Sequence, residues 1–226
     1  CAKIALPGLW RYIHYLTTRM DEGGLIAIGL GDWCAPYTFY HPDYKYRAPL
    51  VFTDSVISMD ICEKTAFLFE KTGKKPQADF CRAVASGLKA AIRKHLIDLD
   101  TMTAIGVGTA TPGAQTSQAM AIFYNLFTED EKPAAFEVLL RKLREENDHL
   151  DTGVLGARVI FHVLSEFGYD AYAYKIMVDP EAPSYGHWVA RGETALPEDF
   201  LRYDQHVSSL NHHFFGDVSA WFIKSV

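Results

Sequence analysis

The feature that most constrains the fold of this chain is a series of segments with helical periodicity, several of which end at a glycine. In these segments the apolar residues recur every three or four positions and therefore share one face of a helix. Gly73 and Gly168 stand where helices commonly end. The predicted helices cover residues 4–20, 53–72, 76–96, 116–127, 128–144, 155–167, 169–177 and 214–226.

Short connections between consecutive predicted helices indicate antiparallel neighbours, so the expected fold class is all-α, built from helical hairpins. The chain has 226 residues, of which 49% are hydrophobic, which is enough for a sizeable core. We expect residues 1–226 to form a single helical domain.

Charge and motif content exclude several classes of partner. The formal net charge is −6 and no basic stripe is visible, so we expect no nucleic-acid partner. The longest apolar runs are too short to cross a bilayer, and we expect no membrane span. The four cysteines have no zinc-binding spacing, and the chain carries no nucleotide-binding motif, so we expect neither a metal nor a cofactor.

Two long loops, predicted over residues 25–50 and 179–211, hold most of the residues that can carry chemistry. In the first loop Asp32 and Trp33 stand together, and a Trp face suits the C–H face of a sugar ring while Asp32 could hold hydroxyls. The alternative is a core Trp beside a turn-forming Asp.

Three further stretches contain candidate site residues. Asp151 lies directly before a predicted helix, where it is either a site residue or an N-cap. The acidic stretch 192–199 includes Glu193, Glu198 and Asp199, which are acid/base candidates or a solvated loop. His212 and its neighbour His213 point apart on any helix start, so we read them as hydrogen-bonding residues and not as metal ligands.

The order of four short motifs resembles the bacterial α-L-rhamnosidases of glycoside hydrolase family 78. These motifs are HLDTGVLG, PSYGHWV, GETALPE and SLNHHFFGDVSAWF, and the GDW and TSQAM stretches are also similar to that family. The resemblance covers nearly the whole chain. It implies part of an (α/α)6 barrel, which is a ring of six helical hairpins, and a carbohydrate partner that carries terminal α-L-rhamnose.

The resemblance also implies roles for individual residues. Members of the family are inverting hydrolases with two carboxyl groups, and Glu198 matches the general base. Trp33 and His212 match residues that line the sugar pocket, and Asp151 lies in a matching motif. The base motif departs from the family pattern GATTxWE at Glu193 and Pro197, which leaves Glu193 and Asp199 as rivals for the base.

The family's general acid belongs to an RDE-type motif followed by GWTGD, and no such motif precedes the GDW stretch here. Arg19-Met20-Asp21-Glu22 lacks the aromatic and glycine context and reads as a helix end. Six hairpins also need about twelve helices, and roughly eight are predicted.

We therefore expect a C-terminal portion of the catalytic domain, which is inactive alone and is completed by the missing hairpins or by self-association. The alternatives are another six-hairpin carbohydrate-active enzyme or a non-catalytic carbohydrate-binding helical module.

Overall fold

The computed structural model describes residues 2–36, 48–104, 114–200 and 209–225, and most of the residues in these ranges are helical. The sole sheet within them is a hairpin of two strands, β1 and β2, each two residues long. The elements in chain order are α1 (Ala2–Thr17), α2 (Leu50–Lys71), α3 (Lys75–Leu96), β1 (Ile97–Asp98), β2 (Thr103–Ala104), α4 (Gln115–Phe123), α5 (Lys132–Glu145), α6 (Val154–Glu166), α7 (Asp170–Val178), α8 (Tyr185–Ala190), a 3-10 helix (His213–Asp217) and α9 (Val218–Ser225).

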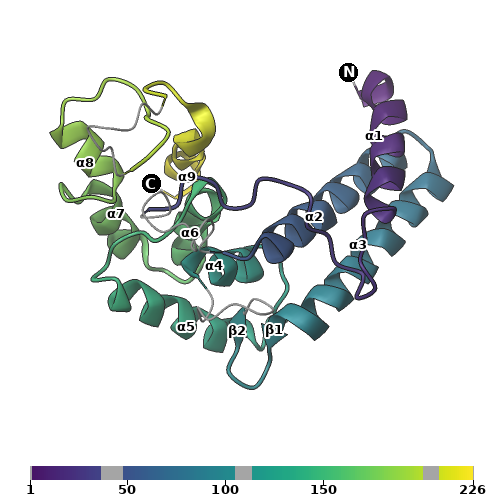
Figure 1. The fold of residues 1–226 in the computed structure, drawn as a ribbon, viewed down its shortest axis with the longest axis horizontal. Coiled ribbons are helices and arrows are strands. Elements are labelled where there is room, and N and C mark those ends of the chain that lie inside the picture. The colour runs from purple at the N-terminus through teal and green to yellow at the C-terminus, as the bar shows by residue number, and fades with distance from the viewer. Residues whose placement is uncertain (1, 37–47, 105–113, 201–208, 226) are drawn as a thin grey trace.

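The helices form an open arc of hairpins, with a gap between α1 and the α8–α9 end (Figure 1). Helices α2, α4, α6 and α9 follow one another along the inner side, since α4 packs on both α2 and α6, and α6 packs on α9. Their hairpin partners α3, α5 and α7 cover the outer side. The all-α hairpin prediction is therefore confirmed.

Glycine ends two of the hairpin helices as the sequence predicts. Gly73 and Gly168 have φ values of 75° and 77°, a conformation that side chains disfavour. Each is followed by a residue whose amide reaches back to the helix, from Lys74 to the Phe69 carbonyl and from Tyr169 to the Leu164 carbonyl, both at 2.9 Å. These bonds satisfy carbonyls that the helix ends would leave unpaired.

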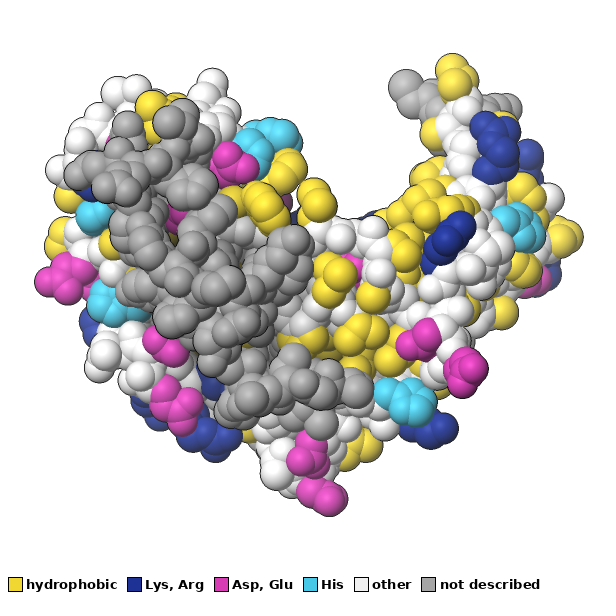
Figure 2. Space-filling model, viewed as in Figure 1, with side chains coloured by type: hydrophobic (Ala, Val, Ile, Leu, Met, Phe, Trp, Pro, Cys, Tyr) yellow, Lys and Arg dark blue, Asp and Glu magenta, His cyan; other side chains and the backbone are white. Residues whose placement is uncertain are grey.

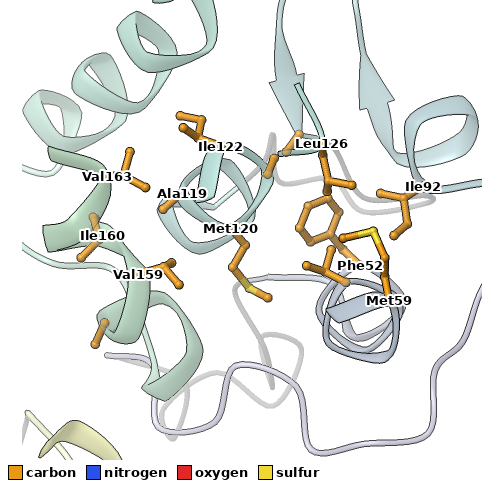
Figure 3. Close-up of a cluster of buried hydrophobic side chains, with 14 of the residues drawn as sticks. Phe52, Met59, Ile92, Ala119, Met120, Ile122, Leu126, Val159, Ile160 and Val163 are labelled. Atoms are coloured by element: carbon orange, nitrogen blue, oxygen red, sulfur yellow. The ribbon is translucent and has the colours of Figure 1, made fainter. Parts of the chain in front are cut away.

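The core lies where α4 meets α2 on one side and α6 on the other. Figure 3 shows Met120 and Ile122 of α4 between the α6 side chains Val159 and Val163 and the α2 side chain Phe52. Every residue of α4 from position 115 to position 122 is buried. A helix that is covered on all sides must bury its polar residues too, and these need hydrogen-bond partners.

Gln118 shows how α4 meets this requirement. Its side-chain oxygen accepts a hydrogen bond from the Ala104 amide at 2.8 Å. Its side-chain nitrogen donates to the carbonyls of Met102 and Ala135 at 2.8 and 2.9 Å. This single amide thus joins the β1–β2 hairpin and α5 to the central helix.

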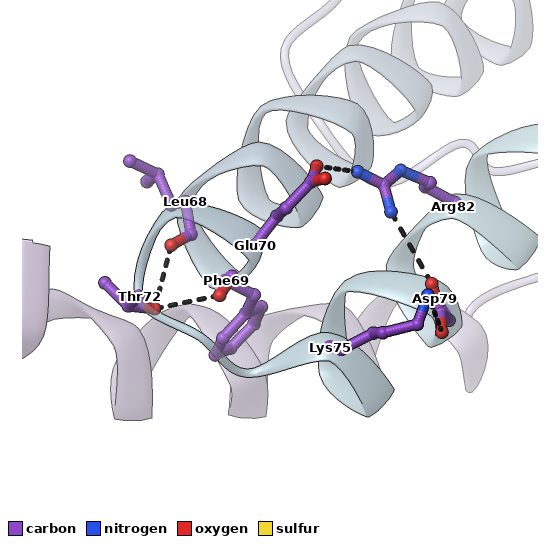
Figure 4. Close-up of polar contacts among 7 residues, drawn as sticks. All are labelled: Leu68, Phe69, Glu70, Thr72, Lys75, Asp79 and Arg82. Atoms are coloured by element: carbon purple, nitrogen blue, oxygen red, sulfur yellow. Dashed lines mark hydrogen bonds and ion pairs between the residues drawn. The ribbon is translucent and has the colours of Figure 1, made fainter.

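Ion pairs at the α2–α3 turn lie at the surface. Figure 4 shows Arg82 between Glu70 and Asp79, while Lys75 also reaches Asp79 at 3.9 Å. All four side chains are about half exposed or more, so these pairs add little to stability. The hairpin is held instead by buried apolar residues of α2 and α3, including the free thiols of Cys62 and Cys81.

Several predicted boundaries are wrong: the helices predicted over 4–20 and 116–127 end earlier, at Thr17 and Phe123, and the helix predicted over 128–144 begins later, at Lys132. The predicted loop 179–211 contains α8, and the predicted loop 98–112 contains the second residue of β1 and all of β2. The last helix opens as a 3-10 turn before α9 begins at Val218. Short elements of this kind are set by contacts with the rest of the fold, which periodicity does not report.

A substitution at Gln118 tests the role of its amide. We expect Gln118→Leu to lower the free energy of unfolding by about 2–4 kcal/mol, because three buried backbone groups lose their partner. Urea denaturation measures the change. The control is Gln77→Leu on α3, a half-buried position without a side-chain hydrogen bond, where we expect less than about 0.5 kcal/mol. Equal effects at both positions would contradict the assigned role.

Candidate active site

Hydrogen bonds tie together the amino-terminal ends of three inner helices. Asp54 and Ser55, in the second turn of α2, accept hydrogen bonds from the backbone amides of Gly29 and Ile26 in the loop that carries Trp33. Gln115, the first residue of α4, accepts from the Asp151 amide just before α6 at 2.9 Å. The first long loop is therefore fixed near the start of α2, and the segment before α6 is fixed to the start of α4.

Asp32 connects this loop directly to α4 and α6. One carboxylate oxygen accepts from the Thr116 hydroxyl at 2.5 Å and the Gly153 amide at 2.8 Å. The other accepts from the amides of Leu155 and Gly156 at 2.9 and 3.1 Å. Asp32 thus supplies the cap that α6 lacks in its own sequence. Burial raises the pKa of this carboxyl, and the hydrogen bonds offset that effect only in part.

This arrangement differs from the role that the sequence suggested for Asp32. The side chain is 0% exposed, and protein donors occupy both oxygens where sugar hydroxyls were expected. Asp32 instead holds the backbone of Trp33, whose carbonyl accepts from the Val154 amide at 2.9 Å.

Gly153 allows this close approach between the loop and α6. A Cβ atom at this position would stand 2.3 Å from the Trp33 carbonyl oxygen and 2.5 Å from that of Asp32. Both neighbours are backbone atoms, which cannot rotate away. The glycine of the DTG stretch is therefore a packing requirement of the site.

Trp33 and Glu198, which are far apart in the sequence, come into contact. The indole Nε1–H donates to Glu198 Oε1 at 3.4 Å, and the Ser209 amide donates to Glu198 Oε2 at 3.1 Å. The Glu198 amide in turn donates to the Ser209 carbonyl at 2.9 Å, and the His212 amide donates to the Leu196 carbonyl at 2.7 Å. These bonds pin the GETALPE loop to the SLNHH stretch.

Below this loop lies an aromatic cluster formed by Tyr185, Trp188, Phe200 and Phe215. Trp188 stacks on Phe200 with centroids 4.5 Å apart, and its indole donates to the Asp199 carbonyl at 3.1 Å. The Tyr185 hydroxyl donates to the Phe215 carbonyl at 2.9 Å. Helix α8 thus supports the acidic loop, a role that residue types in the PSYGHWV stretch did not reveal.

The rival carboxylates are placed differently from Glu198. Glu193 follows α8, and its amide closes that helix by donating to the Trp188 carbonyl at 3.0 Å. Asp199 is only 5% exposed. Cys34 is buried close to Glu198, Asp199 and Asp32; burial first and then these charges raise its pKa, so the thiol stays neutral.

Trp33 also lines a hollow of about 390 Å³ on the inner side of the arc. Its walls include Asp54 and Ile57 of α2, Leu155 and Arg158 of α6, and Phe214. Figure 2 shows the surface hollowed between the two arms, with hydrophobic side chains along the arm of α1–α3. A concave surface of this volume is large enough for a sugar-sized ligand.

His212 and Asp151 border this region without lining the same hollow as Trp33. The His212 ring lies 4.2 Å from Phe214, centroid to centroid, and its Nδ1 is buried without a hydrogen bond. Asp151 lines a neighbouring hollow of about 180 Å³ with Glu146, His149 and Glu181. We expected Trp33, Asp151 and His212 to converge on one cleft, but Trp33 and Asp151 line separate hollows and His212 contacts Phe214 at the first of them.

In residues 2–36, 48–104, 114–200 and 209–225 no three His, Cys, Asp or Glu side chains are arranged to hold a metal ion. None of the helices in these ranges is both long and apolar enough to cross a membrane.

The fold and the site define a class: all-α proteins built from helical hairpins, with functional loops before the inner helices. Within that class the chain belongs to the bacterial α-L-rhamnosidase six-hairpin glycosidase domain family, whose model matches residues 3–226. The resemblance inferred from the motifs is therefore confirmed.

Curated relatives and solved structures agree with this assignment. An α-L-rhamnosidase of Alteromonas sp. (strain LOR) is 26% identical over an alignment of 231 positions, which covers 97% of this chain and 24% of that protein. The structure of an α-L-rhamnosidase from Dictyoglumus thermophilum matches 98% of this chain and 24% of its own length, with 27% identity and a TM-score of 0.84. A Streptomyces avermitilis α-L-rhamnosidase complexed with L-rhamnose shares the fold, with 24% identity, a TM-score of 0.81, and coverage of 98% and 20%. The chain thus spans about a quarter of the length of these relatives.

A substitution at Gly153 tests the packing of the site. We expect Gly153→Ala to lower the unfolding midpoint by several degrees, because the added methyl meets two backbone carbonyls and forces the loop away from α6. Thermal unfolding measures the shift. The control is Gly87→Ala on α3, where a methyl would meet nothing within 4 Å and would favour the helix. A Gly153→Ala protein as stable as Gly87→Ala would contradict the close approach.

Proposed function

We propose that this chain is part of the catalytic domain of an inverting α-L-rhamnosidase and that Glu198 is its general base. The observation that carries the proposal is the Glu198 carboxylate, held by the Trp33 indole and the Ser209 amide at the loop end of the inner helices. Relatives that match nearly the whole chain bear the name α-L-rhamnosidase.

The reaction follows from two carboxyl groups on opposite faces of the sugar. Glu198 removes a proton from a water molecule, whose oxygen attacks the anomeric carbon as the bond to the leaving oxygen breaks. A general acid protonates that oxygen, and rhamnose leaves with inverted anomeric configuration. In inverting glycosidases the two carboxyl groups stand roughly 6.5–9.5 Å apart, which leaves room for the water.

The other site residues bind the sugar in this proposal. The Trp33 ring offers an apolar face to the sugar, and the buried His212 Nδ1 is available for a hydrogen bond. Asp151 acts at the edge of the site, in the neighbouring hollow. Asp32 acts through Trp33, which it holds in place. The substrate is a glycoside with a terminal α-L-rhamnose.

The general acid comes from outside this chain in our proposal, as do the hairpins that complete the ring. The hollow beside Trp33 carries exposed apolar residues, among them Leu30, which is 67% exposed, and Phe214. Soluble proteins rarely leave such surface uncovered. Helices from the rest of a longer polypeptide would pack against these exposed apolar residues and enclose the hollow, since the matched relatives are about four times longer than the aligned part.

Activity of the isolated chain tests this division. We expect the 226 residues alone to release no measurable nitrophenol from 4-nitrophenyl α-L-rhamnoside, whereas the full-length polypeptide hydrolyses it. Part of the pocket and the acid, which contributes about 10²–10⁴ in rate, are absent from the chain. Robust turnover by the chain alone would show that it contains its own acid, with Glu22 the first candidate.

Parallel substitutions in the full-length polypeptide identify the base. We expect Glu198→Gln to lower kcat by about 10²–10⁴ with little change in KM, because the amide keeps the shape but accepts no proton. Initial rates on the aryl rhamnoside measure both constants. The matched control is Glu193→Gln in the same loop, which we expect to stay near wild type.

Other results of the comparison between Glu198→Gln and Glu193→Gln would overturn parts of the proposal. If Glu193→Gln is inactive while Glu198→Gln is active, the base assignment is wrong. If both retain activity, an inverting mechanism through this loop is refuted. Asp199→Asn tests the remaining candidate for the base. Because Asp199 is buried, we expect this substitution to lower the stability of the protein and not kcat alone.

A further inference from the structure

The indole of Trp33 has two separate surfaces that meet different parts of the site. Its ring lines the 390 Å³ hollow, whereas its Nε1–H points at the Glu198 carboxylate, 3.4 Å from Oε1. A residue that served only as an apolar platform for a sugar would need the ring and not the N–H.

The backbone of Trp33 is held on both sides. Its amide donates to the Gly31 carbonyl at 3.0 Å, and its carbonyl accepts from the Val154 amide at 2.9 Å. The neighbouring Asp32 is fixed by four hydrogen bonds to α4 and α6. The N–H donor therefore has a position that the inner helices set, independently of the acidic loop.

The Glu198 carboxylate receives one donor on each oxygen. The Ser209 amide binds Oε2 and the Trp33 indole binds Oε1. The Ser209 amide lies on a stretch paired with Glu198's own backbone, so it moves with the acidic loop. Trp33 is the donor that links the carboxylate to the helical frame. Each oxygen keeps acceptor capacity for a water molecule.

We propose that Trp33 is a positioning residue for the general base: its indole N–H fixes the rotation of the Glu198 carboxylate so that Oε1 or Oε2 faces the attacking water. This inference rests on the proposed function of Glu198. The 3.4 Å separation is long for a hydrogen bond, and such bonds in ligand-free sites commonly tighten when substrate binds.

Replacing the indole by a phenyl ring separates the two surfaces. Trp33→Phe in the full-length polypeptide keeps an aromatic face but removes the N–H. We expect kcat for the aryl rhamnoside to fall about 10- to 100-fold, because a misaimed base is less effective, while KM changes less than about threefold. A KM rise with kcat unchanged would show a role in sugar binding alone and overturn the proposal, as would a kcat within about twofold of wild type.

The azide-dependent rate of a Glu198→Ala enzyme distinguishes a positioning role of Trp33 from a merely structural one. In Glu198→Ala the missing side chain leaves room for azide, which attacks the anomeric carbon with no proton to remove and leaves a rhamnosyl azide of inverted configuration. Without a carboxylate there is nothing for Trp33 to position. Adding Trp33→Phe to Glu198→Ala should therefore change the azide-dependent rate less than about threefold. An equal loss in both backgrounds would overturn the proposal, and if azide gives no rate, the kcat and KM of Trp33→Phe decide.

Two controls separate the N–H from its surroundings. Trp10→Phe makes the same exchange on α1, where Trp10 packs against the rings of Phe69 and Phe80, and should leave kcat unchanged. Cys34→Ala removes the buried thiol, which also forms a hydrogen bond with the Trp33 side chain. If Cys34→Ala lowers kcat as much as Trp33→Phe, the effect runs through the thiol and the proposal fails.

Failure of this inference can be told apart from failure of the proposed function. An active Glu198→Gln enzyme would refute the base assignment, whatever Trp33→Phe does. An inactive Glu198→Gln enzyme with a normal Trp33→Phe enzyme would leave the base in place and refute only the positioning role.

Discussion

The Asp32 carboxylate is the contact on which the rest of the site depends. It is fully buried, and it binds α4 through Thr116 and the first turn of α6 through three amides. A buried carboxylate is unfavourable unless donors surround it, and here the donors come from segments far apart in the sequence. The same contacts that satisfy this charge also set where Trp33 stands, so the stability of the fold and the geometry of the site have one origin.

Much of the fold could be predicted because it rests on local patterns. The long hairpin helices have clear apolar periodicity, and Gly73 and Gly168 end two of them by a mechanism that residue type alone implies. Helix α8 could not be predicted in this way. It has six residues, and its place is fixed by Trp188 packing on Phe200 and by the Ser184 hydroxyl, which accepts from the His187 amide.

The site shows the same division between local and long-range information. Sequence reasoning singled out Trp33 and Glu198 as separate candidates, and only the fold brings them within hydrogen-bond distance. For Asp32 the residue type allowed either a sugar contact or a turn, and the structure shows a third role, as the cap of another helix. A cap supplied from a distant segment leaves no signature beside the helix that it caps, since Gly153 occupies the usual position.

The shared direction of the inner helices has an electrostatic consequence. Their amino-terminal ends, tied together by Asp54, Gln115 and Asp32, each carry partial positive charge from aligned peptide dipoles. Neutral loops would leave these charges to repel each other. Asp32, whose carboxylate accepts from the first amides of α6, places an acidic group where these dipoles favour negative charge, so the helix orientation itself favours acidic residues on the adjoining loops.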